Sequence, residues 1–182
     1  MQLKHSNAPR IKPILAATQS KEAVASTGWV LTRRDFNAIM PESTFLNGKV
    51  CKLSLPVLQL PLEPDAPALR RLLLPQGELA QFYNAEEGIR YMAFIELLPG
   101  QLRGNHYHKV KEELVYVIRG EVLLSVADID SKASASVALR AGDLAVIRVG
   151  IAHALRPLEP GQAIEFSSAR FDPTDIHKFP VA

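Results

Sequence analysis

The sequence has a single cysteine, Cys51, among its 182 residues. One thiol excludes both an internal disulfide and a zinc site built from several cysteines, because each needs at least two. The apolar runs are short, far below the roughly 20 residues that cross a bilayer as a helix. The net charge of only +2 gives little reason to expect a polyanionic partner. We therefore expect a cytoplasmic protein that engages neither membrane nor nucleic acid.

The beginning of the chain is poor in acids. Before Asp35 it has six basic side chains and one acid, Glu22, and the apolar stretch 14–17 is too short for the core of a secretory signal. A basic start of this kind also resembles an organelle transit peptide, which would place the protein in another compartment. We predict an N-terminal extension over residues 1–45, partly helical or exchanged as an arm, and a folded domain over residues 46–182.

Long helices are also missing from the remainder. Five prolines between positions 56 and 75 prevent a continuous helix there, and we interpret this stretch as a connector and edge. From Gly77 onward, short apolar or alternating runs separated by turn residues predict strands. They lie at 77–82, 90–97, 114–118, 122–126, 136–139, 144–149 and 163–168. The sequence thus predicts an all-β fold, an antiparallel sandwich or barrel.

Histidine is scarce and clustered. Three of the five histidines, His106, His108 and His153, fall inside the strand-rich block. Residues i and i+2 of a strand share a face, with Cα atoms about 6.6 Å apart, so His106 and His108 can point the same way. From that separation two imidazoles can converge on one metal ion.

A carboxylate follows the histidine pair, at either Glu112 or Glu113. If Glu113 points inward, Val115 and Val117 point inward with it, and choosing Glu112 reverses the assignment for the whole strand. The charged link 109–112 is otherwise expected to be solvated, because exposed charges usually contribute little.

The stretch from Gly100 to Gly120 reads GQLRGNHYHKVKEELVYVIRG, with the spacing G-x5-H-x-H-x4-E-x6-G. It resembles the first motif of the cupin superfamily, and the spacing to Gly120 selects Glu113 as the carboxylate. Residues 142–157, GDLAVIRVGIAHALRP, resemble the second motif, with arginine and proline in place of its usual proline and asparagine. The core motifs therefore span residues 100–157.

The resemblance implies an antiparallel double-sheet cupin (jelly-roll) barrel with a metal near its mouth. The implied cofactor is one divalent ion, which the motif leaves open as zinc, iron, nickel or manganese. By the same resemblance the metal ligands are His106, His108, Glu113 and His153.

The segment RGNHYH is also similar to the cupin domains of nucleotide-sugar isomerases and capsular-polysaccharide enzymes, where Arg-Gly-x-His segments line a pocket for a phosphorylated sugar. Arg103 and Asn105 are thus candidate substrate-binding residues, although a surface arginine needs no partner. Strand alternation predicts Tyr91 on the same face as Ala93, as a core or rim aromatic that can reach the interior. Arg148 either holds an anionic ligand or points to solvent.

Taken together, these features predict a small metal-binding cupin enzyme that acts on a polar, anionic small molecule such as a sugar or sugar nucleotide. The metal would serve as Lewis acid in isomerase- or epimerase-like chemistry, and no catalytic base is identified. An Fe(II)-dependent cupin dioxygenase, a non-catalytic binding or sensing module, and a metal-free site with histidine as acid or base are the alternatives. Because cupins commonly pair through sheet edges, we expect a homodimer.

Overall fold

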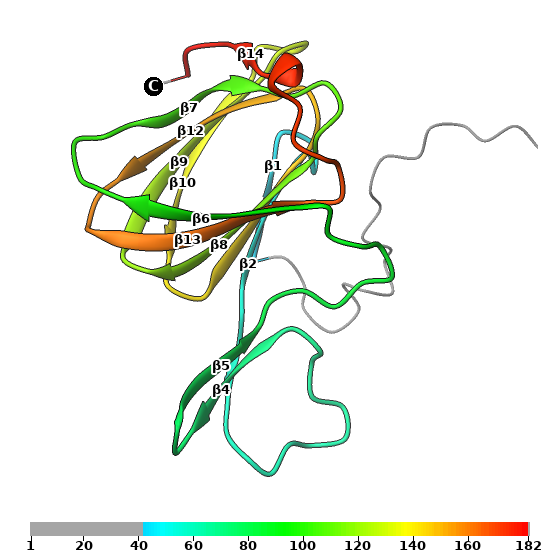
Figure 1. Cartoon of the computed structure of the whole chain (residues 1–182), viewed down its shortest axis with the longest axis vertical. Helices are drawn as coiled ribbons and strands as arrows, with labels where there is room; N and C mark the ends of the chain where they lie inside the picture. Colours follow the sequence, from blue (N-terminus) through cyan, green and yellow to red (C-terminus); the bar gives the residue numbers. More distant parts are fainter. Residues whose placement is uncertain (1–41, 182) are drawn as a thin grey trace, which may run out of the picture.

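The computed structural model describes residues 42–181, which form two large antiparallel sheets facing each other and a small third sheet (Figure 1). The large sheets have the strand orders β1-β2-β11-β8-β13-β6 and β10-β9-β12-β7-β14, and the small one is β3-β4-β5. The elements are β1 (Ser43–Phe45), β2 (Val50–Ser54), β3 (Val57–Leu58), β4 (Arg70–Leu74), β5 (Gly77–Gln81), β6 (Tyr91–Leu97), β7 (Arg103–Tyr107), β8 (Glu113–Arg119), β9 (Glu121–Asp128), β10 (Ser134–Arg140), β11 (Asp143–Ile147), β12 (Ile151–Pro157), β13 (Gly161–Ser167), the 3-10 turn η1 (Pro173–Asp175) and β14 (His177–Lys178). The prediction of an all-β, antiparallel double-sheet barrel is confirmed.

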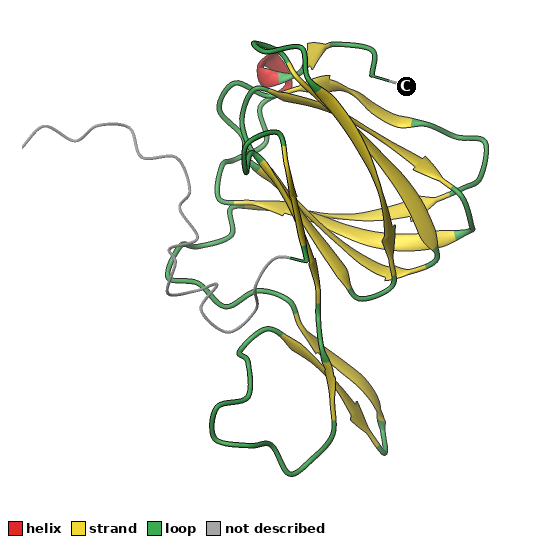
Figure 2. Ribbon diagram, turned by 180° about the vertical axis from the view of Figure 1, so that it is seen from behind, coloured by secondary structure: helices red, strands yellow, loops and turns green. Residues whose placement is uncertain are grey.

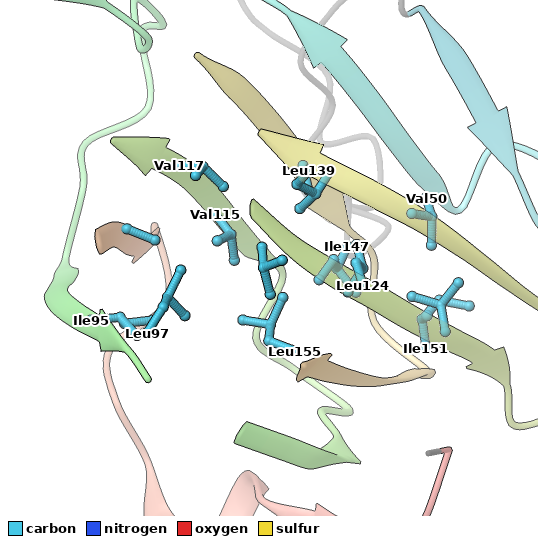
Figure 3. Packing of buried hydrophobic residues seen from close by; sticks show 14 residues of the cluster. Val50, Ile95, Leu97, Val115, Val117, Leu124, Leu139, Ile147, Ile151 and Leu155 are labelled. Carbon is cyan, nitrogen blue, oxygen red and sulfur yellow. The ribbon is translucent and has the colours of Figure 1, made fainter. Parts of the chain in front are cut away.

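The main core fills the space between the two large sheets. Val115 and Val117 of β8 meet Leu124 of β9 and Leu155 of β12 there, and each is nearly or fully buried (Figure 3). Burial of a valine or leucine side chain stabilises the fold by roughly 1.5–3 kcal/mol. The inward position of both valines also places Glu113, two residues before Val115, inside the barrel, as the motif spacing predicted.

A second cluster covers the outer face of the six-stranded sheet. Leu114 and Tyr116, the outward residues of β8, are buried there rather than exposed. The ring of Phe82, just after β5, stacks on Tyr116 with centroids 4.3 Å apart. The small sheet itself projects from the barrel (Figure 2). The proline-rich stretch, expected as connector and edge, contributes the strands β3 and β4 to it.

Every strand predicted after Gly77 is present, with ends shifted by up to two residues. β12 was not predicted as a strand. Its alanines, Ala152 and Ala154, and its terminal Pro157 have low strand propensity, and β12 forms because it lies between β9 and β7 in the sheet.

The predicted extension and its helices over 19–26 and 33–40 lie outside the described residues, apart from positions 42–45. At that end, β1 pairs with β2, with Thr44 opposite Cys51, so residues 43–45 belong to the six-stranded sheet. Within residues 42–181, no helix has the length and apolar character needed to span a membrane.

Candidate metal centre

Three histidines and one glutamate meet inside the barrel, where β7 ends and β8 and β12 begin. Ligand atoms from His106, His108, Glu113 and His153 all lie within 4.8 Å of one another. His106 and His153 are directly opposed across the β7–β12 pair, and Glu113 is the first residue of β8. The structure thus brings the four sequence-predicted ligands together.

A β-bulge in β7 sets the direction of these side chains. Gly104 pairs with Ala154 and His106 with His153, so Asn105 is an extra residue in the strand. Gly104 and Asn105 both have positive φ, 93° and 53°. Such a bulge resets the alternation of the strand, so Arg103 faces the same side as His106.

The outer ring nitrogens of two histidines bind backbone carbonyls. His108 Nδ1 lies 2.7 Å from the Asp175 carbonyl oxygen, and His153 Nδ1 lies 3.1 Å from that of Ile151. A carbonyl oxygen only accepts, so each Nδ1 donates its hydrogen and leaves Nε2 with a free lone pair. Metal-binding histidines are typically held in this way.

The turn after His108 is fixed by one carboxylate. Asp175, in η1, accepts hydrogen bonds from the backbone N–H groups of Lys109, Val110 and Lys111. Because its backbone carbonyl also binds the His108 ring, Asp175 supports both a proposed ligand and the turn that leads to Glu113.

The cluster contains a buried nitrogen that has no hydrogen-bond partner among residues 42–181. His108 Nε2 is in this state, and it lies 3.5 Å from Glu113 Oε2. His153 Nε2 lies 3.4 Å from Glu113 Oε1. Tetrahedral ligand atoms around an ion with bonds of about 2.0–2.1 Å are roughly 3.4 Å apart. The residues therefore fit a divalent ion, which would partner the unsatisfied nitrogen.

The charges at the cluster also suit metal binding. Burial, helped by repulsion from His153, lowers the pKa of His106 to about 4, so this ring is neutral near pH 7. Burial alone would raise the pKa of the Glu113 carboxyl, but the His153 and His108 rings and the Lys111 ammonium hold it well below its usual value. A neutral imidazole and an ionised carboxylate are the forms that bind metals. Burial alone would lower the pKa of His153, but Glu113 raises it, so His153 would release a proton on binding an ion.

Two further charged residues adjoin the centre. Lys111 Nζ lies 2.5 Å from Glu165 Oε1 and 3.1 Å from Glu113 Oε2, and it sits 4.7 Å above the Tyr91 ring. The expectation of a solvated link over 109–112 was wrong at Lys111 and Glu112, both of which are buried.

Lys111 and Glu165 were missed as functional residues. Alternation offered a signal for each, because Lys111 shares the inward face with Glu113, and Glu165 pairs with the inward Val115. Burial and the charge of Glu113 raise the pKa of Glu165, although Lys111 opposes this.

The predicted substrate-binding residues take different positions. Tyr91 is half-buried against Lys111, whereas Arg103 is exposed, and its Nε donates to the Glu96 carbonyl oxygen over 3.2 Å. Asn105 Oδ1 accepts a hydrogen bond from the backbone N–H of Val181. Arg148 Nη1 lies 2.6 Å from Glu112 Oε2, on the side of β8 opposite to Glu113.

The family model of the polysaccharide biosynthesis C-terminal domain matches residues 75–164, which include both motifs. A comparison with curated proteins finds no match.

Among solved structures, the TDP-quinovose 3,4-ketoisomerase of Campylobacter jejuni is 18% identical with a TM-score of 0.55, and the alignment covers 61% of this chain and 88% of that one. The dTDP-4-dehydrorhamnose 3,5-epimerase of Sulfolobus tokodaii is 15% identical with a TM-score of 0.60, covering 76% and 80% of the two chains. The corresponding epimerase of Bacillus anthracis, solved with TDP and PPi bound, is 15% identical with a TM-score of 0.59, covering 76% and 82%. At these identities the likeness establishes a shared fold.

Proposed function

Because this chain has the cupin fold, a barrel it shares with sugar-nucleotide epimerases and ketoisomerases, we propose that it is an isomerase or epimerase acting on a nucleotide-linked sugar. The observation that carries the proposal is the polar cluster inside the barrel. There the three histidines and Glu113 adjoin the buried Lys111–Glu165 pair. Fold alone does not determine activity, so the argument rests on these side chains.

The chemistry in question removes a proton from a carbon next to a carbonyl, and then returns a proton either to the opposite face of that carbon (epimerase) or to the neighbouring carbon (isomerase). It needs a group that stabilises the developing enolate and a base that takes the proton. A divalent ion held by His106, His108, Glu113 and His153 would supply Lewis-acid polarisation of the carbonyl if it accepted the carbonyl oxygen as a fifth ligand.

Glu165 is the candidate base. Its carboxylate lies beside the cluster and is only partly exposed, and burial together with the charge of Glu113 raises its pKa. A raised pKa makes a carboxylate a stronger proton acceptor. Lys111 binds Glu165 Oε1, so the proton would be accepted on Oε2.

Glu113 has a different role. Both of its carboxylate oxygens are directed at histidine rings, and Oε2 also contacts Lys111 Nζ. These contacts and its low pKa suit a fixed ligand and oppose proton uptake. The two glutamates therefore differ in function because of their surroundings, with Glu113 holding the metal and Glu165 moving the proton.

Two measurements on the full chain, purified without an affinity tag or added metal, test the proposal. Elemental analysis should find about one zinc, nickel or manganese per chain, lost in His106→Ala and His153→Ala. Deuterium from D2O should enter a nucleotide-linked 4-keto sugar, and Glu165→Gln should slow this exchange by roughly 100-fold or more. Glu159→Gln, at an exposed position after β12, is the matched control.

A metal-loaded wild-type protein that exchanges no deuterium with any nucleotide-linked keto sugar would contradict the proposal. Full exchange in Glu165→Gln would remove Glu165 as base and favour a metal-free site in which a histidine of the cluster accepts the proton. Folded wild-type protein that takes up no metal would favour that same site.

An Fe(II)-dependent dioxygenase is the second candidate, because three imidazoles and one carboxylate also suit iron. Near-stoichiometric iron together with oxygen consumption on a candidate substrate would favour it. Ligand binding without turnover of any kind would favour a binding or sensing module.

A further inference from the structure

A pocket of about 610 Å³ lies beside the metal centre, between the residue before β6, the turn after His108 and the segment 168–175. Its size is typical of small-molecule sites. We propose that this pocket binds the nucleoside diphosphate part of the substrate, with the diphosphate on Arg90 and Arg170 and the base on Phe171. The inference rests on the proposed function, because it assigns the substrate's nucleotide end to a place in the same site.

The positive charges come from two exposed arginines that face the pocket. Among residues 42–181, the guanidinium groups of Arg90 and Arg170 have no hydrogen bond or ion pair. A guanidinium binds phosphate through paired, charge-assisted hydrogen bonds, and two of them match two adjacent phosphates.

The other charged residues of the pocket have partners within the protein. Asp172 accepts hydrogen bonds from the backbone N–H and the hydroxyl of Thr174. Asp175 is engaged by the three backbone N–H groups of the turn, and Lys111 by Glu113 and Glu165. The two arginines are therefore the groups left to receive an anion.

An exposed aromatic ring completes the site. Phe171 is 53% exposed although it stacks on Tyr91, with ring centroids 5.7 Å apart and an interplanar angle of 27°. Stacking on one side leaves the opposite side of the ring for a ligand. A nucleobase is a flat ring, and any of the bases can stack on such a surface.

A chain of contacts joins the pocket to the metal centre. Phe171 stacks on Tyr91, Lys111 Nζ sits 4.7 Å above the Tyr91 ring, and the same Nζ is 3.1 Å from Glu113 Oε2. A nucleotide held by Phe171 and the arginines would thus lie next to the centre. The sugar, joined through the second phosphate, would extend toward the cluster.

Isothermal titration of the full chain with UDP, TDP, GDP, ADP and inorganic pyrophosphate tests the assignment. At least one nucleoside diphosphate should bind the wild type, and Arg90→Met/Arg170→Met should weaken it by roughly tenfold or more, as for loss of charge-assisted contacts. Phe171→Leu should weaken nucleoside diphosphate binding and leave pyrophosphate binding unchanged. Arg156→Met, at an exposed position of β12, is the matched control.

Wild-type affinity in the double arginine variant, or equal loss of pyrophosphate and nucleoside diphosphate binding in Phe171→Leu, would overturn the assignment. So would a wild type that binds none of the five probes. Because Phe171→Leu keeps both arginines, it also tests the pocket if the double variant fails to fold.

Binding of the nucleotide does not depend on turnover, so the two proposals can fail separately. Nucleotide binding without deuterium exchange would refute the proposed function and keep the pocket. Exchange with unaltered affinity in the arginine variants would keep the function and refute the pocket. His106→Ala should retain nucleotide binding in either case.

Discussion

Gly104 lies directly against the carbonyl group of His153, across the β7–β12 pair. A Cβ atom at Gly104 would be 2.5 Å from that carbonyl oxygen, closer than any side chain can tolerate. The φ of 93° disfavours an L-residue as well. This close approach belongs to the bulge that places His106 opposite His153, so the backbone of one glycine positions half of the candidate ligands.

Gly104→Ala should therefore destabilise the protein by roughly 3 kcal/mol or more, because a steric clash adds to backbone strain. Gly48→Ala is the matched control, since Gly48 also has a positive φ, 79°, but open space around its Cβ position. Only the strain of about 1–2 kcal/mol should appear there. Urea unfolding of both variants measures the difference, and equal losses would show that the contact with His153 is unimportant.

Asp175→Ala should weaken metal binding by about 10- to 100-fold, as is typical when a residue that orients a ligand is removed. The substitution removes the carboxylate that accepts hydrogen bonds from three backbone N–H groups in the turn after His108. Without it the turn, and with it the His108 ring, is held less firmly in place. Competition with a chelator gives the affinity. Asp130→Ala, which removes a carboxylate that is 82% exposed and lies outside η1, should retain nearly wild-type affinity.

Lys111→Met should cost about 3–5 kcal/mol of folding free energy, because it leaves two carboxylates, Glu113 and Glu165, buried without their shared cation. Adding Glu165→Met should recover a part of this loss, since the repulsion disappears. A double-mutant cycle by urea denaturation measures the coupling, for which contacting residues give about 0.5–3 kcal/mol. Additive effects would show that the pair does not interact.

The ion pair of Lys49 and Asp128 predicts a pH dependence of stability. The hydrogen bond from Lys49 lowers the pKa of the Asp128 carboxyl, with backbone N–H groups assisting. A carboxyl whose pKa is lower in the folded than in the unfolded state contributes stability above its unfolded pKa of about 3.9. This contribution is lost as the pH falls through the folded value.

Wild type should thus exceed Lys49→Met in stability at pH 6, and the difference should shrink below about pH 4. Urea unfolding at intervals from pH 6 to about 2.5 follows it. A constant difference over this range would argue against titration of Asp128.

The outer face of edge strand β6 predicts self-association. Met92 and Phe94 are 53% and 61% exposed there, which is unusual for neighbouring large apolar side chains on one face. Light scattering should give about twice the chain mass of 20.0 kDa. Phe94→Glu should return the protein to a monomer, and a wild type of single-chain mass would exclude the homodimer.

Much of the fold follows from local patterns in the sequence. A continuous apolar run over residues 114–118 located β8, and the motif spacing to Gly120 chose Glu113 over Glu112, a choice that strand alternation alone had left open. The positions of Lys111 and Glu165 depend on pairing between β8 and β13, which brings residues 54 positions apart into contact. The alternation along one strand indicates which face of the sheet a side chain lies on. It does not indicate which residue of another strand that side chain contacts.

The surroundings of the predicted ligand pocket show the same limit. Arg148 was considered for an anionic ligand, and the structure pairs it with Glu112, 36 positions away. The bulge at Asn105 was equally hidden, because an extra residue in one strand is defined only against its partner.

The support of His108 by Asp175 has a consequence for the order in which the site is completed. The two residues are separated by 67 positions, and all four candidate ligands precede Asp175 in the chain. A growing chain therefore contains the whole donor set before it contains the group that holds His108 in place. Closing so long a loop costs conformational entropy, so we expect this contact to form after the local hairpins. Tight metal uptake should accordingly follow the docking of η1, so that a barrel with its ligands in place but η1 undocked exchanges its metal rapidly.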